Sequence, residues 1–541
     1  MGSMKEEIAQ RIEAAIRHLQ ETEMFPSFDI PAIEVVRPKD DQFGDYTSNV
    51  ALIVSKQAGK NPREIAEKIK EQLTTNGEQG DIFEKIEVAG PGHLNFHLSQ
   101  RVLGEVLDEV IEKDGSFGSS DFGKGKRILM EFVSANPTGP IHLGNARGGP
   151  IGDSLALILK KSGYSVETEY YVNDYGNQVS VLGHSILKDE LAQYRGDYID
   201  ELSLGLETSD LTSRDPLSVG VWAAGQIIEK HIKPVCERAS IHFDNWFSEK
   251  SLHESGEVSA VLHLLKEKNL TYEKENAVWF KSTEFGDDKD RVLVKSDGET
   301  VTYTVPDFAY HKNKLERGFD TLINIQGADH HGQAAVVKRF VEDVLGKKDV
   351  VSLIMTQFVR IMKDGVEVKM SKRRGTYYAL DDLIEEVGKD AVRFMFSLYA
   401  PTSHISFDIN LALEHSEKNP VFYVQYAHAR LASVLRKAEE EGMSVAGDSL
   451  LLVHEKERAL LQELLHFSEL IEETAKDYSV HRLPQFAMHL ADKLHSFYAA
   501  CRVIDTENKE LSQARLKLVS GVRVVLAETL RLIGVSAPEK M

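Results

Sequence analysis

The segment Glu131–Asn145 reads E-F-V-S-A-N-P-T-G-P-I-H-L-G-N and separates two stretches with different hydrophobic periods. Upstream, residues 127–134 are apolar and read as a β-strand. Downstream, residues 152–163 repeat their apolar positions as an amphipathic helix does, and Gly163 ends the repeat. The segment therefore predicts a turn that leads from a strand directly into a helix.

This turn carries the residue types that hold a phosphate group. Gly139 and Gly144 allow the backbone to approach a ligand closely, and His142 offers a hydrogen-bond donor. The helix that follows adds unpaired N–H groups and the positive end of its dipole. A histidine beside a glycine is most often part of an ordinary loop, so the turn taken alone leaves both interpretations open.

A second motif lies at residues 367–376, which read E-V-K-M-S-K-R-R-G-T. Lys369 follows His142 by 227 positions (369 minus 142). A short basic loop with glycine can bring two ammonium groups onto a triphosphate. Taken alone, such a run is more often a solvated turn.

Together the two motifs resemble, in type and order, the paired nucleotide motifs of class I aminoacyl-tRNA synthetases. The chain departs from those motifs with Asn145 where a second histidine is usual and Arg373 where a final serine is usual, and neither change removes a hydrogen-bond donor. Four segments resemble the arginyl-tRNA synthetase family in particular: S-A-N-P-T-G-P-I-H-L-G, Y-Y-V-N-D-Y-G-N-Q, Y-T-V-P-D-F-A-Y-H and F-Y-V-Q-Y-A-H-A-R. The resemblance spans nearly the whole chain.

Three domains are expected, and the overall class is α/β. Residues 4–115 read as an α+β domain, in which Asn61 and Pro62 begin a helix and two strand-like runs flank a Gly-Pro-Gly turn. Residues 120–395 read as a doubly wound, Rossmann-like parallel sheet with an insertion at about 185–300. Residues 400–541 show long 3.6-residue periods, as a helical bundle does. The resemblance implies that the first domain contacts tRNA and that the bundle binds the anticodon.

The resemblance also implies an ATP site. His142 and Asn145 would donate to the phosphates, and Lys369 and Lys372 would hold the leaving pyrophosphate; these four are the expected catalytic residues. Mg²⁺ should accompany ATP through phosphate oxygens and water, without a structural metal. The full expected ATP set is Gly139, His142, Gly144, Asn145, Gly327, Asp329, Lys369, Met370, Ser371 and Lys372.

A guanidinium substrate requires a carboxylate in bidentate reach, preferably beside an aromatic ring. Tyr303 and Asp307 supply this pair, although the spacing alone fits a structural cap equally well. The resemblance implies that Glu131 and Asn136 hold the amino and carboxylate groups of arginine. Further polar residues fall where the next strand ends, the ligand edge of an open parallel sheet: Asn173, Asp174 and Gln178. Of these three, Gln178 is expected to bind arginine.

Composition limits the remaining possibilities. The net charge is −21, but residues 411–541 hold 16 Lys and Arg against 19 Asp and Glu, so a basic RNA-binding face in the last quarter is allowed. No apolar run reaches the length of a membrane span, and no secretory signal is recognisable, so we expect a cytosolic protein. Two cysteines are too few for a Cys-rich zinc site. The adjacent His330 and His331 could suggest a metal, but neighbours in sequence rarely point at one ion, so zinc is not expected. Aromatic and basic residues of the bundle are candidates for stacking on unpaired bases: Tyr423, Tyr426, His428 and Arg430.

The function that the resemblance implies is ATP-dependent charging of arginine tRNA with L-arginine by a monomer without a membrane partner. Two other classes stay open. A nucleotidyltransferase with the same histidine turn would need no tRNA, and the two flanking domains argue against it. A non-catalytic RNA-binding relative would leave ATP untouched, and the presence of His142, Lys369 and Lys372 argues against it.

Overall fold

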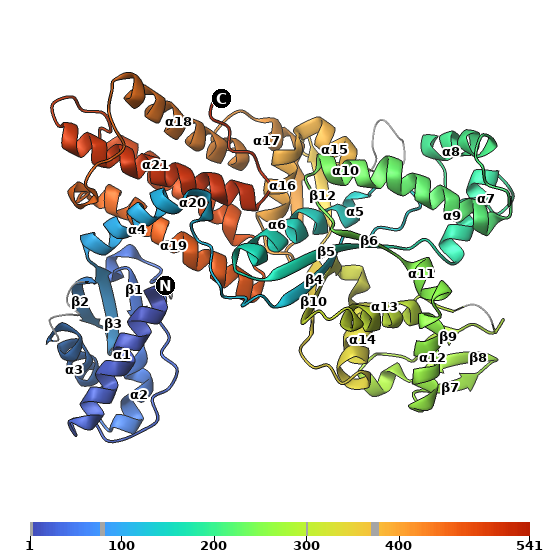
Figure 1. The fold of residues 1–541 in the computed structure, drawn as a ribbon, viewed down its shortest axis with the longest axis horizontal. Coiled ribbons are helices and arrows are strands. Elements are labelled where there is room, and N and C mark those ends of the chain that lie inside the picture. The colour runs from blue at the N-terminus through green and yellow to red at the C-terminus, as the bar shows by residue number, and fades with distance from the viewer. Residues whose placement is uncertain (1–3, 76–81, 299–300, 369–377) are drawn as a thin grey trace.

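The computed structural model describes residues 4–75, 82–298, 301–368 and 378–541. Figure 1 shows an N-terminal unit that hangs below a helical bundle, and a central sheet that joins the bundle to a lobe of short helices and hairpins. The limits of the three predicted domains stay predictions.

The N-terminal unit is a three-stranded antiparallel sheet covered by helices. Asn61 accepts a hydrogen bond from the N–H of Arg63 (2.9 Å) at the start of the helix that begins with Pro62, as the sequence predicts. Strands β2 and β3 pair antiparallel across residues 90–92. The elements are α1 (Met4–Glu21), β1 (Tyr46–Ser48), α2 (Val50–Ala58), α3 (Pro62–Thr75), β2 (Phe83–Ala89), β3 (His93–Leu98) and α4 (Gln100–Lys113).

The bundle contains four long helices, and α4 packs against them. The helices are α18 (Pro420–Glu440), α19 (Glu455–Asp477), α20 (Arg482–Ala500) and α21 (Lys509–Leu532). Helix α4 contacts both α19 and α21. A Cβ atom added at Gly521 of α21 would lie 2.5 Å from Leu107 and 3.6 Å from Val110 of α4, so glycine permits this close approach. Helix α4 therefore completes the apolar core of a bundle whose other helices lie at the far end of the chain.

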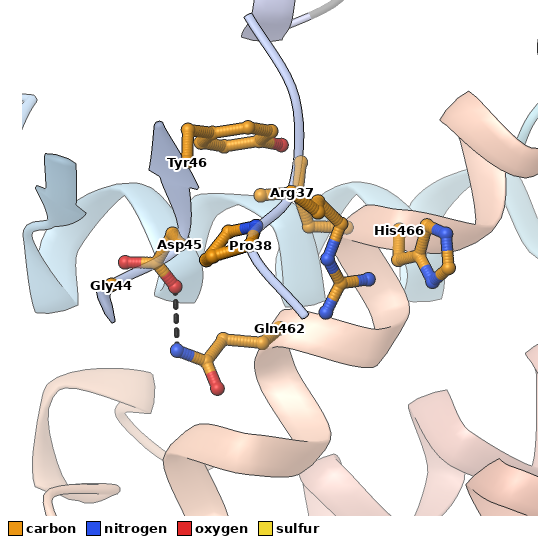
Figure 2. Close-up of a pocket in the computed structure, with 8 residues that line it drawn as sticks. Arg37, Pro38, Gly44, Asp45, Tyr46, Gln462 and His466 are labelled. Carbon is orange, nitrogen blue, oxygen red and sulfur yellow. Dashed lines mark hydrogen bonds between the residues drawn. The ribbon is translucent and has the colours of Figure 1, made fainter. Parts of the chain in front are cut away.

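The N-terminal sheet is docked on α19 by polar contacts (Figure 2). The hydroxyl of Tyr46, which is buried, donates to Glu469 (2.8 Å). Asp45 accepts from Gln462 (2.5 Å), and Arg37 forms an ion pair with Glu463 (3.2 Å). A small, open hollow lies among these contacts and is lined by Arg37, Pro38, Gly44, Asp45, Tyr46, Gln462, Leu465 and His466.

Glu463 is the electrostatic centre of this docking surface. Its burial alone would raise its pKa, but hydrogen bonds from His466 and His489 and the charge of Arg37 hold the pKa of the carboxyl well below its ordinary value. The same hydrogen bond to Glu463 raises the pKa of His489 against the effect of burial. Because the pKa of Glu463 is lowered, its carboxylate stabilises the fold at pH values above the pKa of an unfolded glutamate, and this stabilisation is lost as pH falls. Because the pKa of His489 is raised, its protonated ring stabilises the fold at pH values below the pKa of an unfolded histidine, and this stabilisation is lost as pH rises.

Glu463→Gln should lower the melting temperature more at pH 6 than at pH 8, because Glu463 stabilises His489 only while this histidine carries its proton. The slope of melting temperature against pH between about 6 and 8 should therefore be more positive in Glu463→Gln than in the wild type. Thermal unfolding at several pH values measures both effects. An exposed control, Glu439→Gln, should leave the slope unchanged; a wild-type slope that survives in Glu463→Gln would refute the assignment.

The central sheet has five parallel strands in the order β11, β10, β4, β5, β6. The strands are β4 (Arg127–Phe132), β5 (Ser165–Val172), β6 (Asn245–Ser248), β10 (Thr321–Gly327) and β11 (Val351–Thr356). Because β4 is first in sequence and lies in the middle, the chain proceeds outward first to one side and then to the other. This is the doubly wound order, and the predicted fold class is confirmed.

Strand β6 differs from the sequence prediction. It falls within residues 185–300, which we expected to interrupt the sheet as an insertion, yet it pairs with β5 from Asn245 to Ser248. The strand is four residues long, and none of its residues is fully buried, so it has no hydrophobic signature. The separate three-stranded sheet in this stretch is formed by β7 (Thr271–Lys274), β8 (Ala277–Phe280) and β9 (Arg291–Val294).

Helices cover both faces of the central sheet (Figure 1). The helices between the N-terminal unit and the bundle are α5 (Leu143–Ala146), α6 (Gly148–Lys161), α7 (Asn177–Leu187), α8 (Asp197–Glu207), α9 (Pro216–Ile227), α10 (Lys233–Arg238), α11 (Glu249–Glu254), α12 (Glu257–Glu267), α13 (Thr304–Glu316), α14 (His331–Arg339), α15 (Leu380–Val387), α16 (Lys389–Ser397) and α17 (Ile409–Leu413). A further small sheet comprises β12 (Val359–Lys363), β13 (Val366–Glu367) and β14 (Ile405–Asp408).

In the described ranges, we find no helix with both the length and the apolar character needed to cross a membrane.

Candidate active site

The sequence-predicted turn lies at the point where the strand order of the central sheet reverses. Strand β4 has β10 on one side and β5 on the other, and the chain leaves it at Phe132. Val133 and Ser134 then adopt positive φ values of 67° and 38°. A β-branched residue in this conformation is strained, and such strain persists where the surrounding structure fixes it. The chain is thus bent sharply at the edge of the sheet where ligands bind in doubly wound folds.

His142 is the N-cap of the short helix α5. Its Nδ1 accepts a hydrogen bond from the N–H of Gly144 (2.9 Å). In the neutral ring the proton therefore sits on Nε2, which makes that nitrogen a donor. Desolvation lowers the pKa of His142, which favours the neutral form. Asn145 follows on the exposed side of the same turn, so both predicted donors occupy one short segment.

The residues that follow the basic motif lie beside this turn. The N–H of Leu380 donates to the carbonyl of Ile141 (3.0 Å), and the N–H of Leu143 donates to the carbonyl of Tyr378 (3.4 Å). His142 and Ala379 form an isolated antiparallel bridge between them. The predicted ATP-binding residues of the motif itself lie outside the described residues: Lys369, Met370, Ser371 and Lys372.

Gly327 ends strand β10, next to β4 in the sheet. Asp329 follows in a short 3-10 turn, and a Cβ atom added at Gly327 would lie 2.5 Å from its Oδ1. Side chains larger than glycine would therefore displace this carboxylate. The arrangement leaves Asp329 largely exposed at the same edge of the sheet as the histidine turn.

Asp307 lies in the first turn of α13, on the side of the sheet where Tyr171 and Tyr310 are buried. Its Oδ2 accepts a hydrogen bond from Gln333 (2.8 Å). Burial, supported by the carboxylates of Glu131 and Glu249, raises the pKa of Asp307 to about 7, although the hydrogen bond from Gln333 opposes the shift. A cation that enters beside such a carboxyl group favours its ionised form and lowers its pKa.

Glu131 belongs to a buried network that also reaches Asp307. Lys314 donates to Glu131 (2.6 Å) and to the amide oxygen of Asn324 (3.3 Å). Asn324 donates to Nε2 of His311 (2.7 Å), whose Nδ1–H donates to the carbonyl of Asp307 (2.8 Å). Burial keeps the pKa of His311 well below its ordinary value, so its ring is neutral, as this pattern requires. The two carboxylates predicted to hold the substrate are thus fixed relative to each other.

The other predicted arginine-binding residues are Asn136, Gln178 and Tyr303, and Asn173 and Asp174 are the polar residues expected where the next strand ends. Asn173 donates to the side chain of Asn136 (2.7 Å), so the ends of β4 and β5 meet there. Asp174 is occupied by Ser248 (2.6 Å) and by the N–H of Lys250, which gives it a structural role. Gln178 is exposed near the start of α7, and Tyr303 is 62% exposed at the start of α13.

Three of the four bundle candidates retain accessible surface. Tyr426 is exposed, Arg430 lies over the ring of Tyr498, and Tyr423 donates to Asp492 (2.6 Å). His428 is different, because its ring is buried and its Nδ1 bonds to the carbonyl of Pro538 (2.8 Å). The stacking role that we considered for His428 does not fit this placement, and its position on the inner face of α18 explains why.

Arg147 is the residue of the turn that sequence reasoning missed. Arg147 is 1% exposed, and no carboxylate among the described residues pairs with its guanidinium. Instead it donates to backbone carbonyls at the end of α16 and in the segment before β14, namely those of Phe396, Tyr399, Ala400, Pro401 and Ser403, and to that of Gln357. A cation at a helix C-terminus satisfies carbonyls that have no partner within the helix. Arg147 thus ties the histidine turn to the junction with the bundle.

Glu249 and Gln333 were also missed. Both act on Asp307, as described above, and both lie close to the ends of parallel strands: Glu249 begins α11 directly after β6, and Gln333 lies in α14 after β10. The sequence could have indicated both residues by their position after a strand. Glu249 was missed because β6, the strand before it, has no clear hydrophobic pattern. Across the described residues we find no group of three or more His, Cys, Asp or Glu side chains placed to hold a metal ion.

Comparisons with known proteins extend this description. The tRNA synthetase class I (R) catalytic domain matches residues 107–202 and 224–397, the arginyl tRNA synthetase N terminal domain matches residues 4–98, and the DALR anticodon binding domain matches residues 424–541. The doubly wound sheet with the histidine turn at its switch point is therefore that of a class I aminoacyl-tRNA synthetase.

Individual relatives agree with these family matches. An arginine–tRNA ligase of Bacillus subtilis is 42% identical over 99% of both chains, and one of Listeria welshimeri is 41% identical over 100% of both. The arginyl-tRNA synthetase structure of Thermus thermophilus shares the fold, with a TM-score of 0.76 and 22% identity over 99% of this chain and 100% of that one. The chain belongs to the arginyl-tRNA synthetase family.

Proposed function

We propose that the chain activates L-arginine with ATP, releases pyrophosphate, and transfers the arginyl group to the 3′ end of arginine tRNA. The observation that carries this proposal is the position of the Asp307 carboxyl group beside Glu131 and Glu249, with hydrogen bonds through His311, Asn324 and Lys314 that connect it to Glu131 on the strand leading into the histidine turn. Family membership supports the reaction class, and the acidic pocket supports a cationic substrate.

Activation needs positioning and charge stabilisation more than proton transfer. The arginine carboxylate attacks the α-phosphorus of ATP, a P–O bond forms, and the bond to the leaving pyrophosphate breaks. His142 would donate from Nε2 to a phosphate oxygen, since its Nδ1 is held by Gly144. Asn145 would add a second donor. Lys369 and Lys372 would stabilise the charge that develops on pyrophosphate.

Arginine recognition would rest on Asp307. An incoming guanidinium favours the ionised carboxylate, so binding would displace the proton that Asp307 retains near neutral pH. Glu131 and Asn136 would face the amino and carboxylate groups of the substrate. The network through Lys314 would keep Glu131 at a fixed distance from Asp307, so the pocket would measure the length of the amino acid.

The remaining assignments are also proposals. Mg²⁺ would arrive with ATP, bound mainly by phosphate oxygens and water, which fits a site built from hydrogen-bond donors. Tyr423, Tyr426 and Arg430 would contact the anticodon region of the tRNA. A cytosolic location and a monomeric state complete the proposal.

The experiment is a charging assay that offers each of the twenty amino acids with unfractionated tRNA, ATP and Mg²⁺. We expect arginine alone to be esterified, and chelation of Mg²⁺ to abolish the reaction. Formation of arginyl-adenylate should be assayed with and without tRNA, because a test without tRNA alone can mislead in this family.

The other outcomes discriminate between functions. Esterification of another amino acid would overturn the assignment of the pocket. Binding of tRNA without consumption of ATP would identify a non-catalytic RNA-binding protein. Nucleotide transfer that proceeds without any tRNA or amino acid would identify a nucleotidyltransferase.

A further inference from the structure

A buried hydroxyl group near Asp307 has no hydrogen-bond partner. Tyr171 lies near the end of β5 and is 5% exposed, and its phenolic oxygen is fully buried without a partner in the described part of the chain. A buried polar group of this kind costs free energy unless a ligand or partner satisfies it. Tyr171 therefore differs from its neighbour Tyr170, whose hydroxyl donates to the carbonyl of Ala135 (2.7 Å).

The ring of Tyr171 is held firmly. It packs against Tyr310 with ring centroids 4.4 Å apart, and it stacks on Phe247 at 6.3 Å. The N–H of Tyr171 donates to the hydroxyl of Ser134 (3.1 Å), which in turn donates to Glu131 (3.2 Å). Tyr171 thus belongs to the same group of contacting residues as Glu131 and Asp307, the carboxylates that are predicted to bind the substrate.

The charges around this hydroxyl are negative. Burial raises the pKa of Tyr171 well above its ordinary value, and the carboxylates of Glu249, Asp307, Glu131 and Asp174 raise it further. Carboxylates accept hydrogen bonds but do not donate them when ionised. The lone pairs of the hydroxyl oxygen consequently lack a donor, and the surroundings favour a donor that is also a cation.

Gln333, which contacts Asp307, shows the same deficit. Its amide nitrogen donates to Asp307, while its oxygen Oε1 is buried without a partner. Two acceptors without donors thus accompany one carboxylate of raised pKa. A guanidinium has five N–H donors in one plane, whereas an ammonium group has three on a single atom.

We propose that the Tyr171 hydroxyl is a specificity-determining group that accepts a hydrogen bond from the guanidinium of the bound substrate. The inference rests on the proposed function, since it assigns Tyr171 to the pocket of Asp307. It adds a neutral hydrogen-bond acceptor to that pocket. This acceptor favours binding of a guanidinium over an ammonium group of the same charge, because the guanidinium has more N–H donors.

The test removes one oxygen atom. Tyr171→Phe should raise the dissociation constant of arginine about tenfold, because one buried hydrogen bond to a charged group is lost. The same variant should unfold at an equal or higher temperature than the wild type without ligand, because an unsatisfied polar group disappears. A purely structural role would produce the reverse pattern. Calorimetry for binding and thermal unfolding with and without arginine supply both readings.

Tyr46→Phe is the matched control. Tyr46 is equally buried, but its hydroxyl is satisfied by Glu469 in the N-terminal unit. This variant should lower the unfolding temperature and leave arginine binding unchanged. Agmatine, which carries the guanidinium without the carboxylate, provides a second probe. Tyr171→Phe should weaken agmatine and arginine by the same factor.

The outcomes separate this inference from the function on which it rests. If Asp307→Asn weakens arginine binding and Tyr171→Phe does not, the role of Tyr171 is refuted and the pocket stands. If neither variant affects binding, the pocket itself is refuted. A loss for arginine without a loss for agmatine would also overturn the contact with the guanidinium.

Discussion

Asp307→Asn is expected to lower kcat/KM for arginine by about 10²–10³-fold, equivalent to roughly 3–4 kcal/mol. Asparagine has almost the same shape as aspartate, so the hydrogen bond from Gln333 to the side-chain oxygen can remain. What is lost is the negative charge opposite a guanidinium in a desolvated pocket. The effect should appear mainly in the KM for arginine, with the KM for ATP unchanged.

The pH dependence provides an independent check. Because the pKa of Asp307 is raised to about 7, the ligand-free carboxyl carries a proton over part of the neutral range, and arginine must displace it. The KM for arginine in the wild type should therefore rise as pH falls below about 7. Asp307→Asn should have a flat profile over the same range. A flat profile in the wild type, or a normal KM in the variant, would contradict the assignment.

Arg147→Leu is expected to lower the free energy of unfolding by about 4–5 kcal/mol, at the upper end of single substitutions. Leucine leaves the carbonyls of Gln357 and residues 396–403 without their donors in a buried site. Arg147→Lys should recover part of the loss, because an ammonium group offers three N–H donors and not five. Desolvation lowers the pKa of Arg147 to about 10, which shows how little counter-charge surrounds it.

Tryptophan fluorescence during urea denaturation measures this effect, because all three tryptophans, Trp222, Trp246 and Trp279, lie in the central part of the chain. Arg436→Leu is the matched control, since Arg436 also donates to a backbone carbonyl, that of Glu539 (3.2 Å), but at an exposed position. This control should change the stability by less than about 0.5 kcal/mol. A similarly small change in Arg147→Leu would refute the proposed tie between the turn and the bundle junction.

The sequence was informative where a pattern is local. The apolar run of residues 127–134 and the periodic run after it predicted the strand and the helix around His142 correctly, because each element reports its own burial through its spacing. The strand ends at Phe132 and not at residue 134, since Val133 and Ser134 turn the chain. The spacing of Tyr303 and Asp307 left a structural cap and a substrate pair equally open; in the structure Tyr303 is the N-cap residue of α13 and Asp307 lies in its first turn.

Contacts between distant segments were not predictable in this way. Glu131 meets Lys314 across 183 positions, and no periodicity marks that pair. The partners of Arg147 are backbone carbonyls, which every residue possesses, so no side-chain pattern identifies them. Strand β6 is short and half-buried, so its residues carry no hydrophobic pattern that would predict its pairing with β5. The roles of the site residues stay predictions.

The place of α4 has a consequence for biosynthesis. This helix is complete when residue 113 has been made, but α19 and α21, which cover its apolar face, end the chain. At about 5–20 residues per second, a ribosome needs roughly 20–80 s to reach residue 509 after it has passed residue 113. During that interval the nascent chain displays an uncovered hydrophobic stripe, which is a natural target for a holding chaperone, and a fragment that begins at residue 400 would inherit the complementary groove.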